Sequence, residues 1–139
     1  MKPQTGNLIF IVDDDPDDRQ LILDAFLKNN REFDFVFINS AVELLSRLNH
    51  IENDFPNLLI LDLNMPGIMG LQALKEIRAN KKFSQIPIVI LTTSTLNTDR
   101  KMSYELGASC FLTKPDSFST MIAYADAMIT LWFPLPQNP

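Results

Sequence analysis

A run of four apolar residues, Leu58 to Leu61, ends in the carboxylate of Asp62, and a turn over residues 65–70 follows. A short run that is apolar on both faces is typical of a central strand in a parallel sheet with helices on both sides. Asp62 would then lie at the carboxyl end of this strand, the edge at which ligands bind in open α/β sheets. The stretch predicts an acidic residue that is placed for chemistry.

Other short apolar runs have the same character, and segments with helical spacing alternate with them. The further strands are expected over residues 8–12, 33–38, 86–91 and 108–113, and the helices over 16–30, 41–50, 71–79, from 97 or 98 to Gly107, and 117–133. Asp15 and Ser40 are helix-capping residue types, and Pro16 suits a first helical position. Strands that alternate with helices predict a parallel sheet with right-handed crossovers, hence an α/β fold of five βα units.

Size and composition limit the classes of protein to consider. The 139 residues are enough for one domain, and we expect a single domain over 1–139 with its core over about 8–133 and a C-terminal tail over 134–139. A net charge of −5 argues against a nucleic-acid-binding surface. No apolar stretch reaches the roughly 18–20 residues of a membrane span, and the first residues lack a signal-peptide pattern. Cys110 is the only cysteine, which fits a reducing compartment. We expect a cytoplasmic protein with no nucleic-acid or membrane partner.

Polar residues follow four of the five expected strands: Asp13 and Asp14 the first, Asp62 the third, Thr92 the fourth and Lys114 the fifth. Because parallel strands end at the same edge of a sheet, these side chains should converge. Three carboxylates repel each other, since two at ~4 Å cost about 4 kcal/mol at an effective dielectric of about 20. The charge of Lys114 and a divalent ion would balance them, and oxygen ligands suit Mg²⁺. The pattern predicts a magnesium site.

One carboxylate of this group is left free to act as a nucleophile. Aspartate side chains form aspartyl-phosphate intermediates in several enzyme classes. The metal, the ammonium of Lys114 and the hydroxyl of Thr92 are the groups needed to hold charged phosphoryl oxygens. Asp62 stands alone at the middle strand, so it is the candidate nucleophile.

Four motifs, in this order, resemble the receiver domain of two-component response regulators, and the single-domain chemotaxis regulators in particular. They are Ile-Val-Asp13-Asp14-Asp15, Leu-Asp62-Leu-Asn-Met-Pro66-Gly, Leu-Thr92-Thr93-Ser94 and Gly107-Ala-Ser-Cys-Phe111-Leu-Thr-Lys114-Pro115. The resemblance implies a three-layer flavodoxin-like fold with strand order 2-1-3-4-5. It also implies a switch rather than an enzyme: Asp62 accepts a phosphoryl group from a histidine kinase or phosphotransfer protein, and the domain signals to a downstream protein target. The only reactions promoted would be its own phosphorylation and dephosphorylation.

The resemblance assigns metal-binding and lifetime-setting roles to particular residues. Asp13 and Asp14 would hold Mg²⁺ together with Asp62, and the backbone carbonyl of Asn64 would be a further ligand. The residues two beyond the phosphoacceptor and two beyond the threonine tune dephosphorylation in the family. They are Asn64 and Ser94 here.

The resemblance also implies a switch between two conformations. Thr92 and Phe111 would form the switch pair, in which the hydroxyl moves toward the phosphate and the aromatic ring changes rotamer. The Lys114–Pro115 peptide bond would be cis. One departure from the family is Met69, at a position that is often Asp, and we do not expect it to abolish phosphorylation.

Two other classes of function fit parts of the pattern less well. A phosphatase of the haloacid-dehalogenase type needs a second Asp two residues past the nucleophile, where this chain has Asn64. A flavin- or dinucleotide-binding module needs a glycine-rich loop after the first strand, and Asp13 and Asp14 stand there instead. His50 lacks a matching phosphohistidine motif, and Phe111 has the alternative role of core residue.

Further acidic residues and the last helix each have two interpretations. Asp15, Asp17 and Asp18 are either extra metal ligands or, as we favour, cap and dipole residues of the first helix. The helix over 117–133 is apolar nearly all round, with Asp126 as its only charge. One interpretation is that this helix forms a homodimer or partner surface. The other is that a tail from Trp132 to Pro139 folds back over its own domain.

Overall fold

The computed structural model describes residues 6–65 and 70–135, which form a five-stranded parallel sheet and its covering helices. The strand order is β2-β1-β3-β4-β5, as the resemblance implied, and every strand pairing is parallel. The strands are β1 (Leu8–Val12), β2 (Asp34–Ile38), β3 (Leu58–Leu61), β4 (Ile88–Thr92) and β5 (Cys110–Thr113). The helices are α1 (Pro16–Leu27), α2 (Ala41–Asn49), α3 (Gly70–Ala79), η1 (Lys81–Phe83, a 3₁₀ turn), α4 (Asn97–Glu105) and α5 (Phe118–Trp132). The expected turn at Pro66 and the departure at Met69 lie outside the described residues, as does the tail over 136–139.

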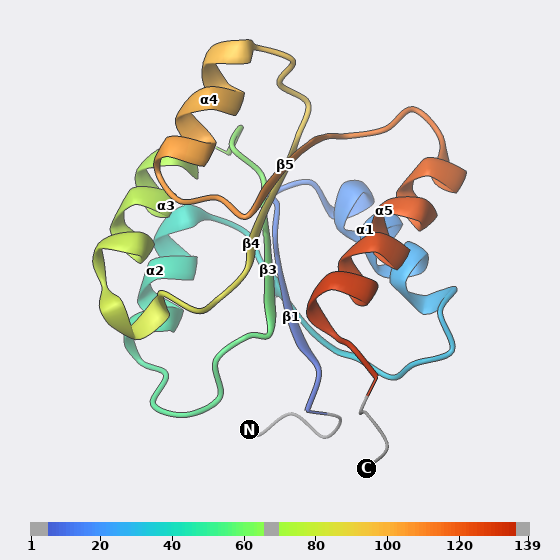
Figure 1. Ribbon diagram of the computed structural model, residues 1–139, viewed down its shortest axis with the longest axis horizontal. Helices are drawn as coiled ribbons and strands as arrows, with labels where there is room; N and C mark the ends of the chain where they lie inside the picture. The colour runs from blue at the N-terminus through green and yellow to red at the C-terminus, as the bar shows by residue number, and fades with distance from the viewer. Residues whose placement is uncertain (1–5, 66–69, 136–139) are drawn as a thin grey trace.

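The sheet is the middle of three layers, with α1 and α5 on one face and α2, α3 and α4 on the other (Figure 1). Successive residues of the central strands alternate between two cores. Leu58 and Ile60 pack in the core shared with α1 and α5, whereas Leu59 and Leu61 pack in the opposite core. Because both faces are covered, the strand is apolar at every position, which is the pattern seen in the sequence. Each fully buried leucine contributes about 1.5–3 kcal/mol.

The expected helix caps are present. Asp15 Oδ1 accepts a hydrogen bond from the backbone N–H of Asp17 at 2.9 Å, and Ser40 Oγ accepts one from Glu43 at 3.1 Å. Helix α1 ends at Leu27, before the expected boundary at residue 30. Its last turn tightens, because the N–H groups of Lys28 and Asn29 bond to carbonyls three residues back rather than four.

The last helix owes much of its apolar character to packing within the domain. Its side chains Met121, Ala125, Met128 and Ile129 are buried in the core that includes α1. Phe133 is buried too, and it packs edge-on against Phe33 with ring centroids 5.2 Å apart. The chain around Phe133 therefore folds back on its own domain. Leu131 and Leu135 remain 65% and 73% exposed.

The expected cis bond before Pro115 is wrong for this structure, in which no peptide bond among the described residues is cis. The trans form of a bond to proline is favoured by about 0.5–1 kcal/mol. The backbone N–H of Lys114 donates to the carbonyl of Thr92 at 2.7 Å, which continues the β4–β5 pairing. A trans bond is compatible with this pairing and with the reach of the Lys114 ammonium to the carboxylates.

No described helix has both the length and the apolar composition that crossing a membrane requires. Helix α5, the most apolar, contains 15 residues, fewer than the roughly 20 needed to span the hydrocarbon core.

Candidate functional site

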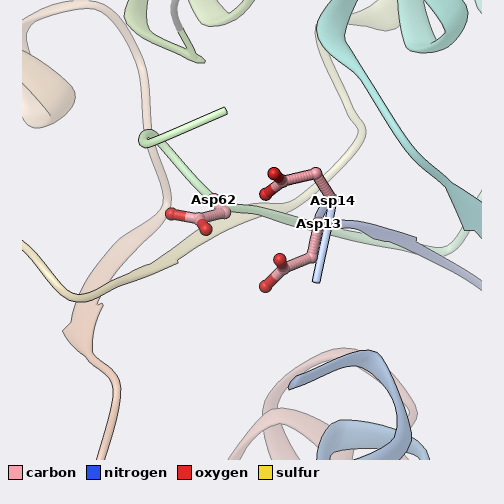
Figure 2. A group of neighbouring side chains, drawn as sticks. All are labelled: Asp13, Asp14 and Asp62. Atoms are coloured by element: carbon pink, nitrogen blue, oxygen red, sulfur yellow. The ribbon is translucent and has the colours of Figure 1, made fainter. Parts of the chain in front are cut away.

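Three carboxylates gather where β1 and β3 end. Val12 and Leu61 are paired in the sheet, and the N–H of Asp62 donates to the carbonyl of Val12 at 3.0 Å, so the residues that follow both strands are neighbours. Oxygen atoms of Asp13, Asp14 and Asp62 all lie within 4.8 Å of one another (Figure 2). Asp13 and Asp62 are buried, whereas Asp14 is exposed. The sheet thus assembles the acidic cluster predicted from the strand ends.

This cluster fits a divalent cation. Asp13 Oδ1 accepts a hydrogen bond from the N–H of Asp15 at 2.9 Å, but the buried Oδ2 accepts none from the described residues. The ammonium of Lys114 lies 2.9 Å from that Oδ2, close enough for an ion pair but off the direction of a hydrogen bond. Burial raises the pKa of Asp13 although Asp15 and Lys114 oppose the rise, and the charge of Asp62 adds to it. Three crowded oxygen donors are the set that Mg²⁺ or Mn²⁺ prefers.

Lys114 brings a partly buried positive charge to these carboxylates. Its Nζ lies 2.9 Å from Asp13, 3.1 Å from Asp62 and 2.6 Å from Asp18, and only 12% of the side chain is exposed. Burial alone would lower the pKa of Lys114, but its hydrogen bond to Asp18 and the charges of Asp13 and Asp62 outweigh burial and raise the pKa above its ordinary value. The ammonium therefore stays charged beside the candidate nucleophile.

Asp18 is the residue of this site that sequence reasoning missed. The sequence favours a helix-dipole role for Asp18, with a metal ligand as the alternative, but Asp18 makes the shortest of the three ion pairs of Lys114. Asp15 is the N-cap of α1, so Asp18 occupies the third helical position. Its carboxylate bonds Lys114, 96 positions away in the chain, so no local sequence pattern indicates this contact.

Asn64 connects the candidate nucleophile, Asp62, to the hydroxyl of Thr92 at the end of β4. Its backbone N–H donates to Asp62 Oδ1 at 3.0 Å, and its side-chain Nδ2 donates to Thr92 Oγ1 at 3.1 Å. Thr92 is fully buried, and its Oγ1 also accepts from the N–H of Ser94 at 3.4 Å. The structure thus brings together Asp62, Asn64, Thr92 and Ser94. The role of the Asn64 carbonyl as a metal ligand stays a prediction.

Phe111 packs in the core and is tied to α4. Its ring is buried among the side chains between the sheet and α2 and α3, which agrees with a core role. Its backbone N–H donates to the hydroxyl of Tyr104 at 3.0 Å, and the guanidinium of Arg100 lies 5.9 Å from its ring centroid. Phe111 and Thr92 lie on adjacent strands, since Ile90 pairs with Phe111. The proposed change of rotamer stays a prediction.

His50 has no part in this site, because its ring nitrogen contacts the carbonyl of Ser46 on its own helix at 2.6 Å.

The site combines a buried carboxylate, a charged ammonium, a hydroxyl and an acidic cluster suited to a cation. These are the groups that phosphoryl transfer to a carboxylate requires.

The sequence itself matches a known protein family. The model of the response regulator receiver domain matches residues 9–126. The chain belongs to the response regulator receiver family. The resemblance seen in the motifs is confirmed, and so is the parallel fold with order 2-1-3-4-5.

The receiver domain is homologous to response regulators of similar length. Rcp1 of Synechocystis sp. is 30% identical over 129 residues, which are 90% of this chain and 88% of Rcp1. The crystal structure of the Mn²⁺-bound form of Rcp1 has a TM-score of 0.82 at 27% identity and covers 96% of this chain and 99% of its own. The phosphorylated cyanobacterial phytochrome response regulator RcpA has a TM-score of 0.84 at 28% identity, covering 96% and 98%.

Other relatives are longer proteins. The Synechocystis response regulator Rre1 is 34% identical over 77% of this chain and 45% of Rre1. The CpxR homolog of Haemophilus influenzae is 34% identical over 87% of this chain and 49% of its own length. The receiver domain thus spans about half of these relatives, so their other functions do not transfer to it.

Proposed function

We propose that this receiver domain accepts a phosphoryl group on Asp62 from a histidine kinase or histidine phosphotransfer protein. The observation that carries the proposal is the position of Asp62, which is buried beside the ammonium of Lys114 at 3.1 Å and within the acidic cluster. A buried carboxylate that is paired with an ammonium is placed to act as the nucleophile toward a phosphoryl group. The other two carboxylates of the cluster, Asp13 and Asp14, have the role of binding a cation.

In the proposed reaction a carboxylate oxygen of Asp62 attacks the phosphorus, an O–P bond forms, and the P–N bond to the donor histidine breaks. The electron pair of the broken bond stays on the histidine nitrogen, and the ring takes up a proton from water as it leaves as a neutral imidazole. Lys114 donates hydrogen bonds to the oxygens that gain charge, and the hydroxyl of Thr92 supplies a further donor once Asn64 releases it. Dephosphorylation is a separate reaction, in which water attacks the phosphorus, the O–P bond to Asp62 breaks, and inorganic phosphate leaves as the carboxylate is restored.

We propose Mg²⁺ as the resident cation, held by Asp13, Asp14, Asp62 and the backbone carbonyl of Asn64. When bound, the ion neutralises charge on the phosphoryl oxygens. Asp13 Oδ2, which is buried and accepts no hydrogen bond from the described residues, supports a cation here, and the related Rcp1 has a Mn²⁺-bound form. Loss of any one acidic ligand should weaken binding of either metal.

We propose that Thr92 and Phe111 pass the phosphorylation signal to a partner surface. The hydrogen bond from the Phe111 backbone to Tyr104 links β5 to α4, so a change at Phe111 acts directly on that helix. A shift between two populated conformations then changes affinity for a downstream protein. A homodimer through α5 is a further proposed contact, supported by the exposed side chains of Leu131 on that helix and of Leu135 just after it. We place the protein in the cytoplasm, with neither nucleic acid nor membrane as its direct target.

The test is incubation with acetyl phosphate and Mg²⁺, followed by intact-protein mass spectrometry and by hydrolysis of the adduct at low and high pH. We expect one phosphoryl adduct that is acid-stable and base-labile. Asp62→Asn should abolish it, and Asp116→Asn, which changes an exposed carboxylate outside the acidic cluster, should retain it. An equal adduct on the Asp62→Asn variant, or none on the unmodified protein, would exclude the proposal.

A further inference from the structure

Asp18 is a fourth carboxylate at the site, and it is not part of the acidic cluster suited to a cation. Its Oδ2 accepts a hydrogen bond from Lys114 Nζ at 2.6 Å, and the two residues are 96 positions apart in the chain. The metal-suited cluster comprises Asp13, Asp14 and Asp62. Asp18 therefore acts on the site through Lys114.

The ammonium of Lys114 makes its hydrogen bonds to two carboxylates on different elements. One bond runs to Asp18 on α1 and the other to Asp62 after β3, at 2.6 and 3.1 Å. The third neighbour, Asp13, is an ion-pair partner only. Lysine carries its charge on a flexible four-carbon stem, so its position at a site depends on such contacts.

We propose that Asp18 is a positioning residue for phosphoryl transfer, and that it holds the ammonium of Lys114 against Asp62. The inference rests on the proposed function. Asp13 is a proposed ligand of the cation, and Asp62 changes chemically in the reaction. Asp18 alone among the described carboxylate partners of Lys114 has neither of these roles.

A second explanation is that Asp18 merely adds negative charge to the first turn of α1. Asp17 provides the matched control, since it lies in the same turn with the same charge. Its backbone N–H is bonded to Asp15, and its carboxylate makes no ion pair with any described residue. The two carboxylates thus differ in their contact with Lys114.

The two explanations predict opposite effects of Asp18→Asn on the rate of phosphorylation. Removing a carboxylate lessens the repulsion of an anionic phosphodonor, so charge alone predicts faster phosphorylation. Loss of positioning predicts slower phosphorylation, because the ammonium of Lys114 is no longer held beside Asp62. We expect Asp18→Asn to slow labelling by acetyl phosphate about tenfold, which corresponds to ~1.4 kcal/mol in the barrier. Asp17→Asn should stay within about twofold of the unmodified protein, and Asp18→Glu should recover part of the rate.

The second readout needs neither metal nor phosphodonor. In ¹⁵N-labelled protein stripped of metal by a chelator, the ammonium signal of Lys114 is assigned by its absence from Lys114→Met. We expect Asp18→Asn to shift this signal and to speed its hydrogen exchange by about tenfold, the effect of losing one charge-assisted hydrogen bond. Asp17→Asn should leave the signal unchanged. Circular dichroism during heating verifies that every variant is folded.

Phosphorylation of Asp18→Asn at the normal rate or faster would overturn the inference, as would equal slowing by Asp17→Asn or an unaltered Lys114 signal. Failure of the proposed function is distinguishable from these results. In that case the unmodified protein forms no adduct on Asp62, whereas the metal-free spectrum still reports whether Asp18 holds Lys114.

Discussion

Nε of Arg78, on α3, donates a hydrogen bond to the backbone carbonyl of Gly107 at 2.9 Å. Gly107 follows Leu106, the C-cap residue of α4, and has a φ of +108°, a conformation that residues with side chains rarely adopt. Nη1 of Arg78 also donates to the carbonyl of Phe83 at 2.9 Å. Burial lowers the pKa of Arg78. Its guanidinium donates hydrogen bonds to backbone carbonyls inside the fold. One guanidinium thus ties α3 to the end of α4, the helix that leads into β5.

Gly107→Ala should destabilise the domain by about 1–3 kcal/mol, because a disfavoured φ adds to a steric clash. The new Cβ would lie 2.7 Å from Cγ of Arg78. Urea denaturation measures the free energy of unfolding. Gly6→Ala is the matched control, since Gly6 also has a positive φ, of 74°, but a Cβ there meets nothing within 4 Å. Equal losses in the two variants would assign the whole effect to backbone conformation and none to Arg78.

Gly70→Ala should both destabilise the domain and slow phosphorylation. A Cβ at Gly70 would lie 2.7 Å from Cα of Leu63 and 2.8 Å from the carbonyl oxygen of Asp62. These are backbone atoms, so the chain beside the phosphoacceptor must move, at a cost of about 1–3 kcal/mol. Chemical denaturation and acetyl phosphate labelling measure the two effects. Gln72→Ala, at an exposed position of the same helix, should change neither quantity, and a silent Gly70→Ala would refute the steric argument.

Asp13→Asn should stabilise the metal-free protein and abolish stabilisation by metal. The raised pKa of Asp13 shows that its ionised form is disfavoured by burial and by Asp62, so a neutral amide relieves this cost. Saturating Mg²⁺ or Mn²⁺ should stabilise the unmodified protein by about 2.7 kcal/mol at 100 times the dissociation constant. Thermal unfolding with metal and with chelator makes both comparisons. Asp116→Asn should behave as the unmodified protein, and metal stabilisation that survives Asp13→Asn would remove Asp13 from the ligand set.

Asn64→Ala should alter the lifetime of the aspartyl phosphate rather than the fold. Asn64 is exposed, and its amide donates to Thr92 Oγ1 at 3.1 Å and to Thr93 Oγ1 at 3.2 Å. Without this amide the Thr92 hydroxyl is free to turn to the phosphoryl group, so we expect a longer lifetime by about threefold to tenfold, the effect of one hydrogen bond. Decay of the phosphorylated protein after removal of the donor is the measurement. Thr93→Ala, which removes only the second contact, should change the lifetime less.

Leu131→Lys should weaken the proposed homodimer without unfolding the domain. Leu131 is 65% exposed on α5, and a lysine there would add like charges to both copies of the proposed self-complementary surface. Light scattering at micromolar concentration, with and without phosphodonor, gives the mass in solution. Thr130→Lys is the control on the neighbouring exposed position. A strictly monomeric mass for the unmodified protein under both conditions would discard the dimer.

Local patterns were enough to predict the sheet, its helices and most of the site. Runs that are apolar at every position, such as Leu58 to Leu61, indicate strands buried on both faces, and residues that directly follow parallel strands share one edge. That rule placed Asp13, Asp62 and Lys114 together correctly, because it needs only the chain direction of each strand. The caps at Asp15 and Ser40 were equally local.

Contacts that depend on how helices dock were decided only by the tertiary structure. Asp18 and Lys114 meet across 96 positions, and Arg78 meets Gly107 across 29, through side-chain reach that no periodicity encodes. The same holds for Phe133, whose burial against Phe33 assigns part of the apolar last helix to the domain's own core. Asp62 was identifiable from its strand alone. The contact of Asp18 with Lys114 was not, because the first turn of α1 reaches Lys114 only after the helix packs on the sheet.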